Sequence, residues 1–288
     1  MPKGISLHIG LNAVDPSHYA GWSGPLTACE ADAEDMQAIA KAKGYATTTM
    51  LKTAAATREA VQEGIKAAAK KLGKGDLFFL TYSGHGGQVP DRDGDEPDDL
   101  KDETWCLYNG ELLDDELYRH WWSFAAGVRI LVLSDSCHSG TATRAARASL
   151  SSDTNRAMLK DPGVEGPVQF RVMPDDIALR TYRQNAVFYD KLQSGKPRKT
   201  RGAAPKASLG ATVRLISGCQ DNQLSADGTF NGLFTGMLLR VWDDGGFKRD
   251  YAAFHGAIVQ RMPPVQTPKH YVIGAHNPTF AAQVPFTI

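Results

Sequence analysis

Residues 131–140 read LVLSDSCHSG, an apolar run that ends abruptly in small polar residues, an acid, a thiol and an imidazole. The preceding residues extend the apolar run to VRILVLSDS (128–136), and DLFFLTYSG (76–84) has the same design, with His85 directly after it. Both runs are apolar at consecutive positions rather than at alternate ones, which is typical of parallel strands buried on both faces. These two stretches predict an α/β protein.

The segments around these two strands alternate between strand and helix patterns. Thr57 is a good N-cap for one of the helices, and Gly44 follows the end of another. The alternation predicts a three-layer α/β sandwich, with a mostly parallel central sheet of about six strands and helices on both faces. The further strands are expected at 5–12, 45–51, 211–218 and 270–274, and the helices at 26–43, 57–72, 114–123, 230–242 and 250–262.

Composition restricts the classes of partner. The 288 residues carry 32 basic and 32 acidic side chains, so no overall field attracts nucleic acid or an anionic membrane. No stretch approaches the roughly 18 consecutive apolar residues that a membrane span needs, and the N-terminus lacks the apolar core of a signal peptide. We therefore expect no nucleic-acid or membrane partner. The widely spaced cysteines do not form a disulfide framework, which favours a reducing, cytoplasmic setting; they are Cys29, Cys106, Cys137 and Cys219.

The ends of the two buried strands carry reactive groups. The carboxyl ends of parallel strands meet at one edge of a sheet, so His85 and Cys137 are predicted to lie there together. An imidazole can take the proton of a thiol and return it to a leaving amine, and the N–H groups of Gly86 and Cys137 could stabilise an oxyanion. His138 points away from its neighbour and is not expected to be the base. Alone, either residue could be structural, but the pair at one edge favours catalysis.

Several motifs carry a resemblance to a known family. YSGHGGQ (82–88) and DSCHSG (135–140) resemble the two catalytic signatures of caspase-like cysteine proteases, specifically metacaspases and their prokaryotic relatives. LTACEADA (26–33) and VRLISGCQDNQLSAD (213–227) are similar to further family motifs, and the resemblance covers about residues 4–245. It implies a caspase-like fold, cysteine endopeptidase activity and a monomer. It also implies one peptidase domain over 1–288, with a large-subunit-like part (1–147), a linker or insertion (148–210) and a small-subunit-like part (211–288).

The charges near Cys137 indicate the substrate. Asp135 lies two residues before Cys137, on the same face of the strand. Metacaspases bind Arg or Lys before the scissile bond, and an acidic pocket suits a guanidinium, whereas caspases that bind Asp need basic residues, which are missing at the matching positions. The resemblance therefore implies protein or peptide substrates with Arg or Lys before the scissile bond. It carries the pocket over to Cys29, Asp32, Ser83 and Asp135; a solvated position is the alternative for Asp32.

The stretch DRDGDEPDDLKDE (91–103) is strongly acidic. Clustered carboxylates in a turn-rich segment suit Ca²⁺, although Glu96 stands where an EF-hand loop needs Gly. The resemblance implies activating Ca²⁺ held by this loop and the next helix, at Asp98, Asp99, Asp102, Asp114 and Asp115. A solvated acidic loop is the alternative, and the acid that the family can have shortly after the catalytic Cys has no counterpart here, where Thr141, Thr143 and Arg144 stand.

The stretch 195–210 places basic residues among Gly, Pro and Ala, which is typical of an exposed linker. A protease that cuts after Arg or Lys could cleave itself there. The candidate sites are Arg198, Lys199 and Arg201, with Arg144 and Arg147 as alternatives. Two other functions stay open from the sequence: a catalytically silent caspase-like scaffold that binds a partner, and a cysteine hydrolase of another class, such as an acyltransferase or esterase.

Overall fold

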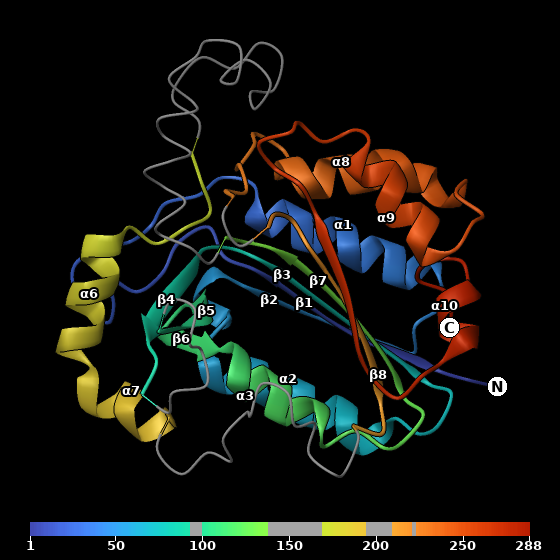
Figure 1. Cartoon of the computed structure of the whole chain (residues 1–288), viewed down its shortest axis with the longest axis horizontal. Helices are drawn as coiled ribbons and strands as arrows, with labels where there is room; N and C mark the ends of the chain where they lie inside the picture. The colour runs from blue at the N-terminus through green and yellow to red at the C-terminus, as the bar shows by residue number, and fades with distance from the viewer. Residues whose placement is uncertain (93–99, 138–168, 194–208, 221–222) are drawn as a thin grey trace.

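The computed structural model describes residues 1–92, 100–137, 169–193, 209–220 and 223–288. A six-stranded sheet lies at its centre, in the strand order β2-β1-β3-β7-β8-β9 (Figure 1). The first five strands of that order are parallel, and β9 pairs with β8 in the antiparallel direction. The strands are β1 (Gly4–Gly10), β2 (Thr47–Lys52), β3 (Leu77–Ser83), β7 (Arg129–Asp135), β8 (Thr212–Ser217) and β9 (Lys269–Gly274).

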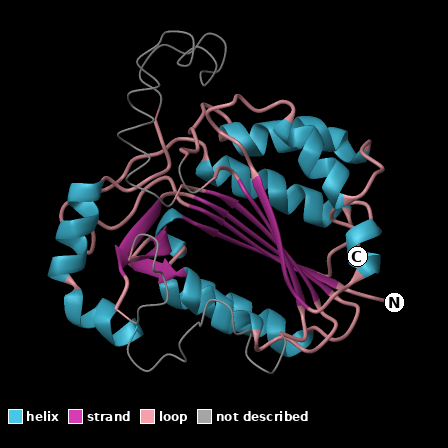
Figure 2. Ribbon diagram, viewed as in Figure 1, coloured by secondary structure: helices cyan, strands magenta, loops and turns pink. Residues whose placement is uncertain are grey.

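Helices cover both faces of this sheet (Figure 2), which confirms the predicted α/β sandwich. Along β3, Phe78 and Leu80 belong to one hydrophobic cluster, and Leu77 and Phe79 belong to the other. Successive side chains of a strand point to opposite faces, so a run that is apolar at every position supplies both cores. One face carries α1 (Cys29–Ala42), α8 (Leu233–Trp242) and α9 (Tyr251–Val259), and the other carries α2 (Arg58–Lys71) and α3 (Asp114–Trp121).

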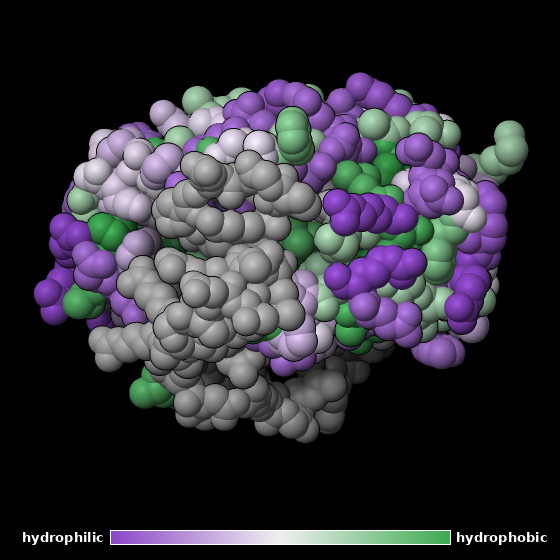
Figure 3. Space-filling model, turned by 90° about the horizontal axis from the view of Figure 1, so that it is seen from above, coloured by the Kyte–Doolittle hydropathy of each residue, from purple (hydrophilic) through white to green (hydrophobic). Residues whose placement is uncertain are grey.

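Helix α2 begins at a side-chain cap. The Thr57 hydroxyl accepts the N–H of Ala60 at the start of α2, as the sequence predicts. The face seen in Figure 3 mixes hydrophilic and hydrophobic residues, as expected for helices that bury only one side. Within the described ranges, no helix has the length and apolar character needed to cross a membrane. Three short helical elements of the described residues are α10 (Pro278–Ala282) and the 3₁₀ turns η1 (Thr53–Ala55) and η2 (Asp243–Gly245).

A second, antiparallel sheet begins directly after His85 and was not predicted. It consists of β4 (Gly86–Pro90), β5 (Lys101–Leu107) and β6 (Gly110–Leu113). The helices α6 (Asp175–Gln184) and α7 (Ala186–Gln193) lie beside it in Figure 1. Both helices fall within the stretch 148–210 that the sequence analysis treats as a linker or insertion, so the described part of that stretch is folded.

Candidate active site

The ends of β3 and β7 bring His85 and Cys137 to one edge of the central sheet. Ser83 pairs with Asp135 in the parallel register, and His85 and Cys137 each follow two residues later. Both side chains are buried, with 5% and 0% of their surface exposed. The structure therefore places together the two reactive groups that the sequence analysis singles out.

The surroundings of His85 fix which ring nitrogen carries the proton. Its Nε2 lies 3.0 Å from the carbonyl oxygen of Gly24, and since a carbonyl only accepts, Nε2 donates. Nδ1 has no hydrogen-bond partner within the described ranges, so its lone pair is available. Burial lowers the pKa of His85 to about 4, although the backbones of Gly24 and Val172 act in the opposite direction. The ring is therefore neutral at neutral pH, with a lone pair at Nδ1.

The backbone around Cys137 converges on a single carbonyl oxygen. The N–H groups of Gly86 and Cys137 both donate to the carbonyl oxygen of Arg171, each at 3.0 Å. These are the two donors that the sequence analysis assigns to an oxyanion hole, and both distances lie in the range that such a site requires. The Cys137 sulfur accepts the backbone N–H of Ser225. This arrangement can polarise the carbonyl of a peptide bond beside a thiol.

Residues 169–173 lie in this site as a segment that pairs with its neighbours at Phe170 and Val172 and bends at Arg171. Arg171 N–H donates to the carbonyl of Ser225 at 3.0 Å, and Phe170 forms an antiparallel bridge with Ala226. On the other side of Arg171, Val172 forms a parallel bridge with Gly86, whose carbonyl accepts the N–H of Met173 at 2.8 Å. Backbone pairing on both sides is how a peptide is bound by strand addition.

The side chain of Arg171 is fully buried among acids, and all five of its N–H groups have acceptors. Three carboxylates surround this one guanidinium, which explains how a cation is held without exposure to water. Burial alone would lower the pKa of Arg171, but the carboxylates, Asp135 first, raise it above its usual value. The acceptors are Asp32 at 2.8 Å, Ser83 at 2.8 Å, Asp135 at 2.9 Å and Asp227 at 2.8 Å from Nη2 and 3.2 Å from Nε.

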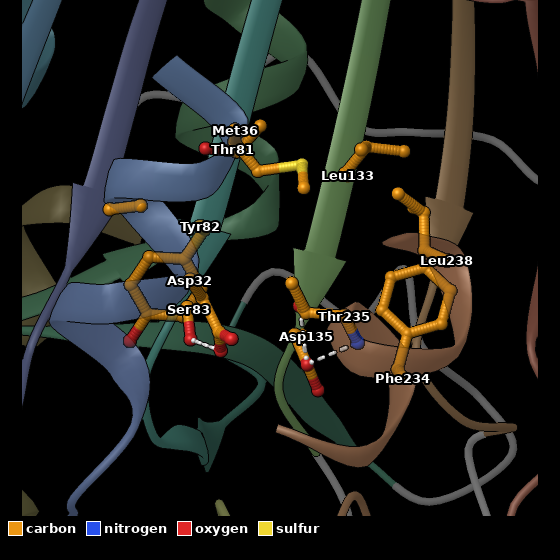
Figure 4. A pocket seen from close by; sticks show the side chains of 11 residues that line it. Asp32, Met36, Thr81, Tyr82, Ser83, Leu133, Asp135, Phe234, Thr235 and Leu238 are labelled. Atoms are coloured by element: carbon orange, nitrogen blue, oxygen red, sulfur yellow. Dashed lines mark hydrogen bonds between the residues drawn. The ribbon is translucent and has the colours of Figure 1, made fainter. Parts of the chain in front are cut away.

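Further donors hold these carboxylates in place. Asp32 accepts the Ser83 hydroxyl at 2.7 Å, and Asp135 accepts the Thr235 hydroxyl at 2.8 Å (Figure 4). Burial raises the pKa of Asp32 to about 6; the Arg171 guanidinium opposes this rise and Asp135 adds to it. Next to the two acids, the pocket is lined by apolar side chains, which Figure 4 shows as Met36, Leu133, Phe234 and Leu238.

The four predicted pocket residues are brought together. Cys29 is buried beside them, and burial raises the pKa of its thiol, so it stays protonated. Asp227 was missed as a pocket residue, although it is the last residue of the motif quoted at 213–227. Arg171 was missed as well, because its partners Gly86, Cys137 and Ser225 lie far away in the sequence.

The structure describes only part of the predicted metal set. Asp102 lies in β5, which pairs with β6, and Asp114 and Asp115 follow β6 as the first residues of α3. Asp98 and Asp99 lie outside the described residues, and the described ones contain no group of three or more His, Cys, Asp or Glu suited to a metal. The predicted self-cleavage sites also lie outside the described residues, as does His138; these sites are Arg144, Arg147, Arg198, Lys199 and Arg201.

Comparisons with known proteins show the family of the chain. The family model described as the caspase domain matches residues 13–285. Metacaspase-1 of Schizosaccharomyces pombe is 29% identical over 268 residues, which cover 82% of this chain and 58% of the relative. Metacaspase-1 of Coccidioides immitis is 30% identical over 253 residues, which cover 82% and 53%. The chain thus spans little more than half the length of these relatives.

Two solved structures are similar to the structure of this chain. Protein GSU0716 from Geobacter sulfurreducens is 55% identical, with a TM-score of 0.86 over 99% of both chains. Caspase-1 from Spodoptera frugiperda is 11% identical, with a TM-score of 0.52 over 94% of this chain and 86% of that one, and shares the fold alone. With a family model matching nearly its whole length, His and Cys at the ends of adjacent strands and metacaspases among its relatives, this chain belongs to the caspase domain family.

Proposed function

We propose that the protein is a cysteine endopeptidase that cleaves after arginine and, less efficiently, after lysine. One observation carries this proposal: a guanidinium, that of Arg171, is bound by three carboxylates while the carbonyl of the same residue accepts both N–H groups beside Cys137. A single arginine can thus place its side chain in the acidic pocket and its carbonyl group beside Cys137 at the same time.

The proposed mechanism uses only groups of this site. His85 Nδ1 takes the proton of the Cys137 thiol, and the sulfur attacks the carbonyl carbon of the substrate arginine. The N–H groups of Gly86 and Cys137 stabilise the oxyanion, and His85 then protonates the departing amine. Water hydrolyses the thioester, which releases the acid product and restores the thiol.

The hydrogen bonds of the pocket favour arginine over lysine. Every N–H of the Arg171 guanidinium has an acceptor, whereas a lysine ammonium has three donors at a single nitrogen. Losing a single hydrogen bond to a charged group already costs ~1.5–3 kcal/mol. We therefore propose that catalytic efficiency on lysine peptides is about 10- to 100-fold lower than on arginine peptides.

Hydrolysis of small fluorogenic peptides tests this function. Peptides that end in Arg, Lys or Asp before the reporter group are compared with the wild-type chain and with Cys137→Ala and His85→Ala. We expect the wild-type chain to hydrolyse the Arg peptide fastest, the Lys peptide more slowly and the Asp peptide not at all. Neither variant should hydrolyse any of them. Activity that persists in Cys137→Ala would rule out the assigned nucleophile. Absence of activity in every preparation would favour the partner-binding scaffold, and hydrolysis of an acyl ester alone would favour the other hydrolase class.

Calcium is the proposed activator. Asp102 is 1% exposed and Asp115 is 6% exposed, and the pairing of β5 with β6 brings the strand that carries Asp102 next to the strand that leads into α3. Carboxylates on these two neighbouring elements support a site for a hard cation such as Ca²⁺. The test measures the melting temperature and peptide hydrolysis with Ca²⁺, Mg²⁺ or a chelator. A rise in melting temperature with Ca²⁺ that Asp102→Asn and Asp115→Asn both remove would support the site. Hydrolysis and melting temperature that are both unaffected by the chelator would make the loop a solvated surface.

A further inference from the structure

The segment Gln169–Met173 occupies the proposed active site in the manner of a substrate. We propose that the bond between Arg171 and Val172 is a self-cleavage site, and that until this bond is cut the segment closes the cleft to other substrates. The inference rests on the proposed function, because it needs Cys137 as nucleophile and the acidic pocket as the arginine site. It adds a modification site that lies apart from the basic stretch 195–210.

The backbone holds the segment on both sides of that bond. Before it, Arg171 N–H donates to Ser225, and the carbonyl of Gln169 accepts the N–H of Asp227 at 2.9 Å. After it, Met173 N–H donates to Gly86. Backbone hydrogen bonds therefore hold the chain on both sides of the Arg171–Val172 bond, as they would hold a substrate around its scissile bond.

The reacting groups of the site surround the same bond. The carbonyl oxygen of Arg171 accepts the N–H groups of Gly86 and Cys137, so its carbon is polarised for attack. Val172, whose nitrogen would be the leaving amine, lies beside His85, because its backbone carbonyl contributes to raising the pKa of the ring. His85 has its free nitrogen lone pair, so it can carry the proton from the thiol to that amine.

The side chains on either side of Arg171 also pack into apolar surroundings. Phe170 packs against a cluster that includes Ala226, Leu233 and Val265. Val172 is 8% exposed and shares a cluster with Cys137. The cleft is thus complementary to an aromatic residue before the arginine and an apolar residue after it, which defines the class of peptide that the site accepts.

Other described arginines nearby lack these features. Arg180 and Arg183 lie within helix α6, where the backbone cannot pair with a strand. The Arg180 side chain is 56% exposed and pairs with Asp176 of the same helix. Among the arginines of the described segment 169–193, Arg171 alone combines backbone bridges at the residues on either side of it with a filled acidic pocket.

The reaction balances without a further reactant except water. The Cys137 sulfur bonds to the carbonyl carbon of Arg171, the bond to the Val172 nitrogen breaks, and the thiol proton reaches that nitrogen through His85. Water then cleaves the thioester, leaving a carboxylate on Arg171 and a free amino group on Val172. The segment is then tethered at one end only, and Gln169–Arg171 can exchange with an added substrate.

The test follows the full chain over time by intact-mass and N-terminal analysis, alongside hydrolysis of a fluorogenic peptide ending in Phe-Arg. Wild type is compared with Cys137→Ala, Arg171→Ala and, as a matched control from the same segment, Arg180→Ala. We expect a new N-terminus at Val172 in wild type and Arg180→Ala, at a rate independent of protein concentration, and none in the other two. Wild-type hydrolysis should accelerate as this N-terminus appears, whereas Arg171→Ala should hydrolyse the peptide without a lag.

The possible failures are distinguishable. Steady peptide hydrolysis by wild type with the Arg171–Val172 bond intact, or cuts confined to other sites such as Arg198 or Arg144, overturns the inference and leaves the proposed function standing. No peptide hydrolysis by wild type or Arg171→Ala overturns the function itself. Arg171→Ala leaves three buried acids without their cation and can fail to fold, so Arg171→Lys is the second variant. It should be cut at the same bond, about 10- to 100-fold more slowly, and a cut at the wild-type rate contradicts the proposal.

Discussion

Asp32 is the residue whose charge most directly affects how the pocket holds a guanidinium. It pairs with Arg171 at 2.8 Å and is nearly fully buried. Removing one partner of a buried charge pair costs ~2–5 kcal/mol, so Asp32→Asn should lower the catalytic efficiency on arginine peptides by at least about 30-fold. The exposed Asp176, which also pairs with an arginine, is the control, and Asp176→Asn should leave the efficiency unchanged. An Asp32→Asn enzyme within twofold of wild type would contradict the pocket.

The same residue predicts how activity depends on pH. The pKa of Asp32 is raised to about 6 with the guanidinium in place, and without that cation it would be higher still. In a pocket without bound arginine the carboxylate is therefore protonated at a pH above about 6, so the KM for arginine peptides should begin to rise above pH about 6 and keep rising as the pH falls. His85, whose pKa is lowered to about 4, remains neutral there.

A pH profile of kcat/KM checks this assignment. In wild type, kcat/KM should fall toward acidic pH, mainly because KM rises. In Asp32→Asn, kcat/KM should be low and should not change with pH over the same range. An acidic limb of the same midpoint in Asp32→Asn would mean that another group titrates.

At the scale of elements, the N-terminus of helix α8 organises the pocket. The N–H of Gly232 donates to Asp32 at 3.1 Å, and the N–H of Thr235 donates to Asp135 at 3.2 Å. The first N–H groups of a helix have no partner within it, and the helix dipole favours negative charge there. One helix start therefore fixes both predicted pocket acids, which come from β7 and α1.

Gly232 allows the close approach that this arrangement needs. A Cβ at this position would lie 2.5 Å from the guanidinium carbon of Arg171, while its φ of −58° is accessible to alanine. Gly232→Ala should therefore fold but bind arginine peptides about 10-fold or more worse, at ~1–3 kcal/mol for overpacking, with a smaller effect on lysine peptides. Gly256 in α9 has open space around it, so Gly256→Ala is the control. Equal kcat/KM in Gly232→Ala and wild type would place the guanidinium elsewhere.

Elements with a strong local pattern could be predicted from the sequence. The continuous apolar runs predicted β3 and β7. The residues after these runs predicted His85 and Cys137 as a pair, because the carboxyl ends of parallel strands lie at one edge of the sheet. The small antiparallel sheet was missed because β4 is only five residues long, GGQVP, and begins with two glycines that are unfavourable in strands. Arg171 could not be found, since its role depends on backbone pairing with Ser225 and Gly86, far away in the sequence.

At the scale of the whole molecule, the sheet joins the two parts of the chain that a cut at Arg171 would create. Strand β7 lies before the cut, and β8, its neighbour, lies after it. The later part also holds Tyr189 of α7, which is fully buried and lies 2.7 Å from the His18 ring. Covalent continuity at residue 171 is therefore unnecessary for the fold.

If the chain is cut there, the products 1–171 and 172–288 should stay together. Separating them would expose the strand edges of β7 and β8 and the apolar faces of both cores, which is unfavourable in water. We expect one gel-filtration peak at the position of uncut Cys137→Ala, two bands on a denaturing gel, and separation only in denaturant. Because unfolding of the cut form releases two chains, its melting temperature should rise with protein concentration, whereas that of Cys137→Ala should not. Two peaks under native conditions would mean that the peptide link at Arg171, rather than the shared sheet, holds the molecule together.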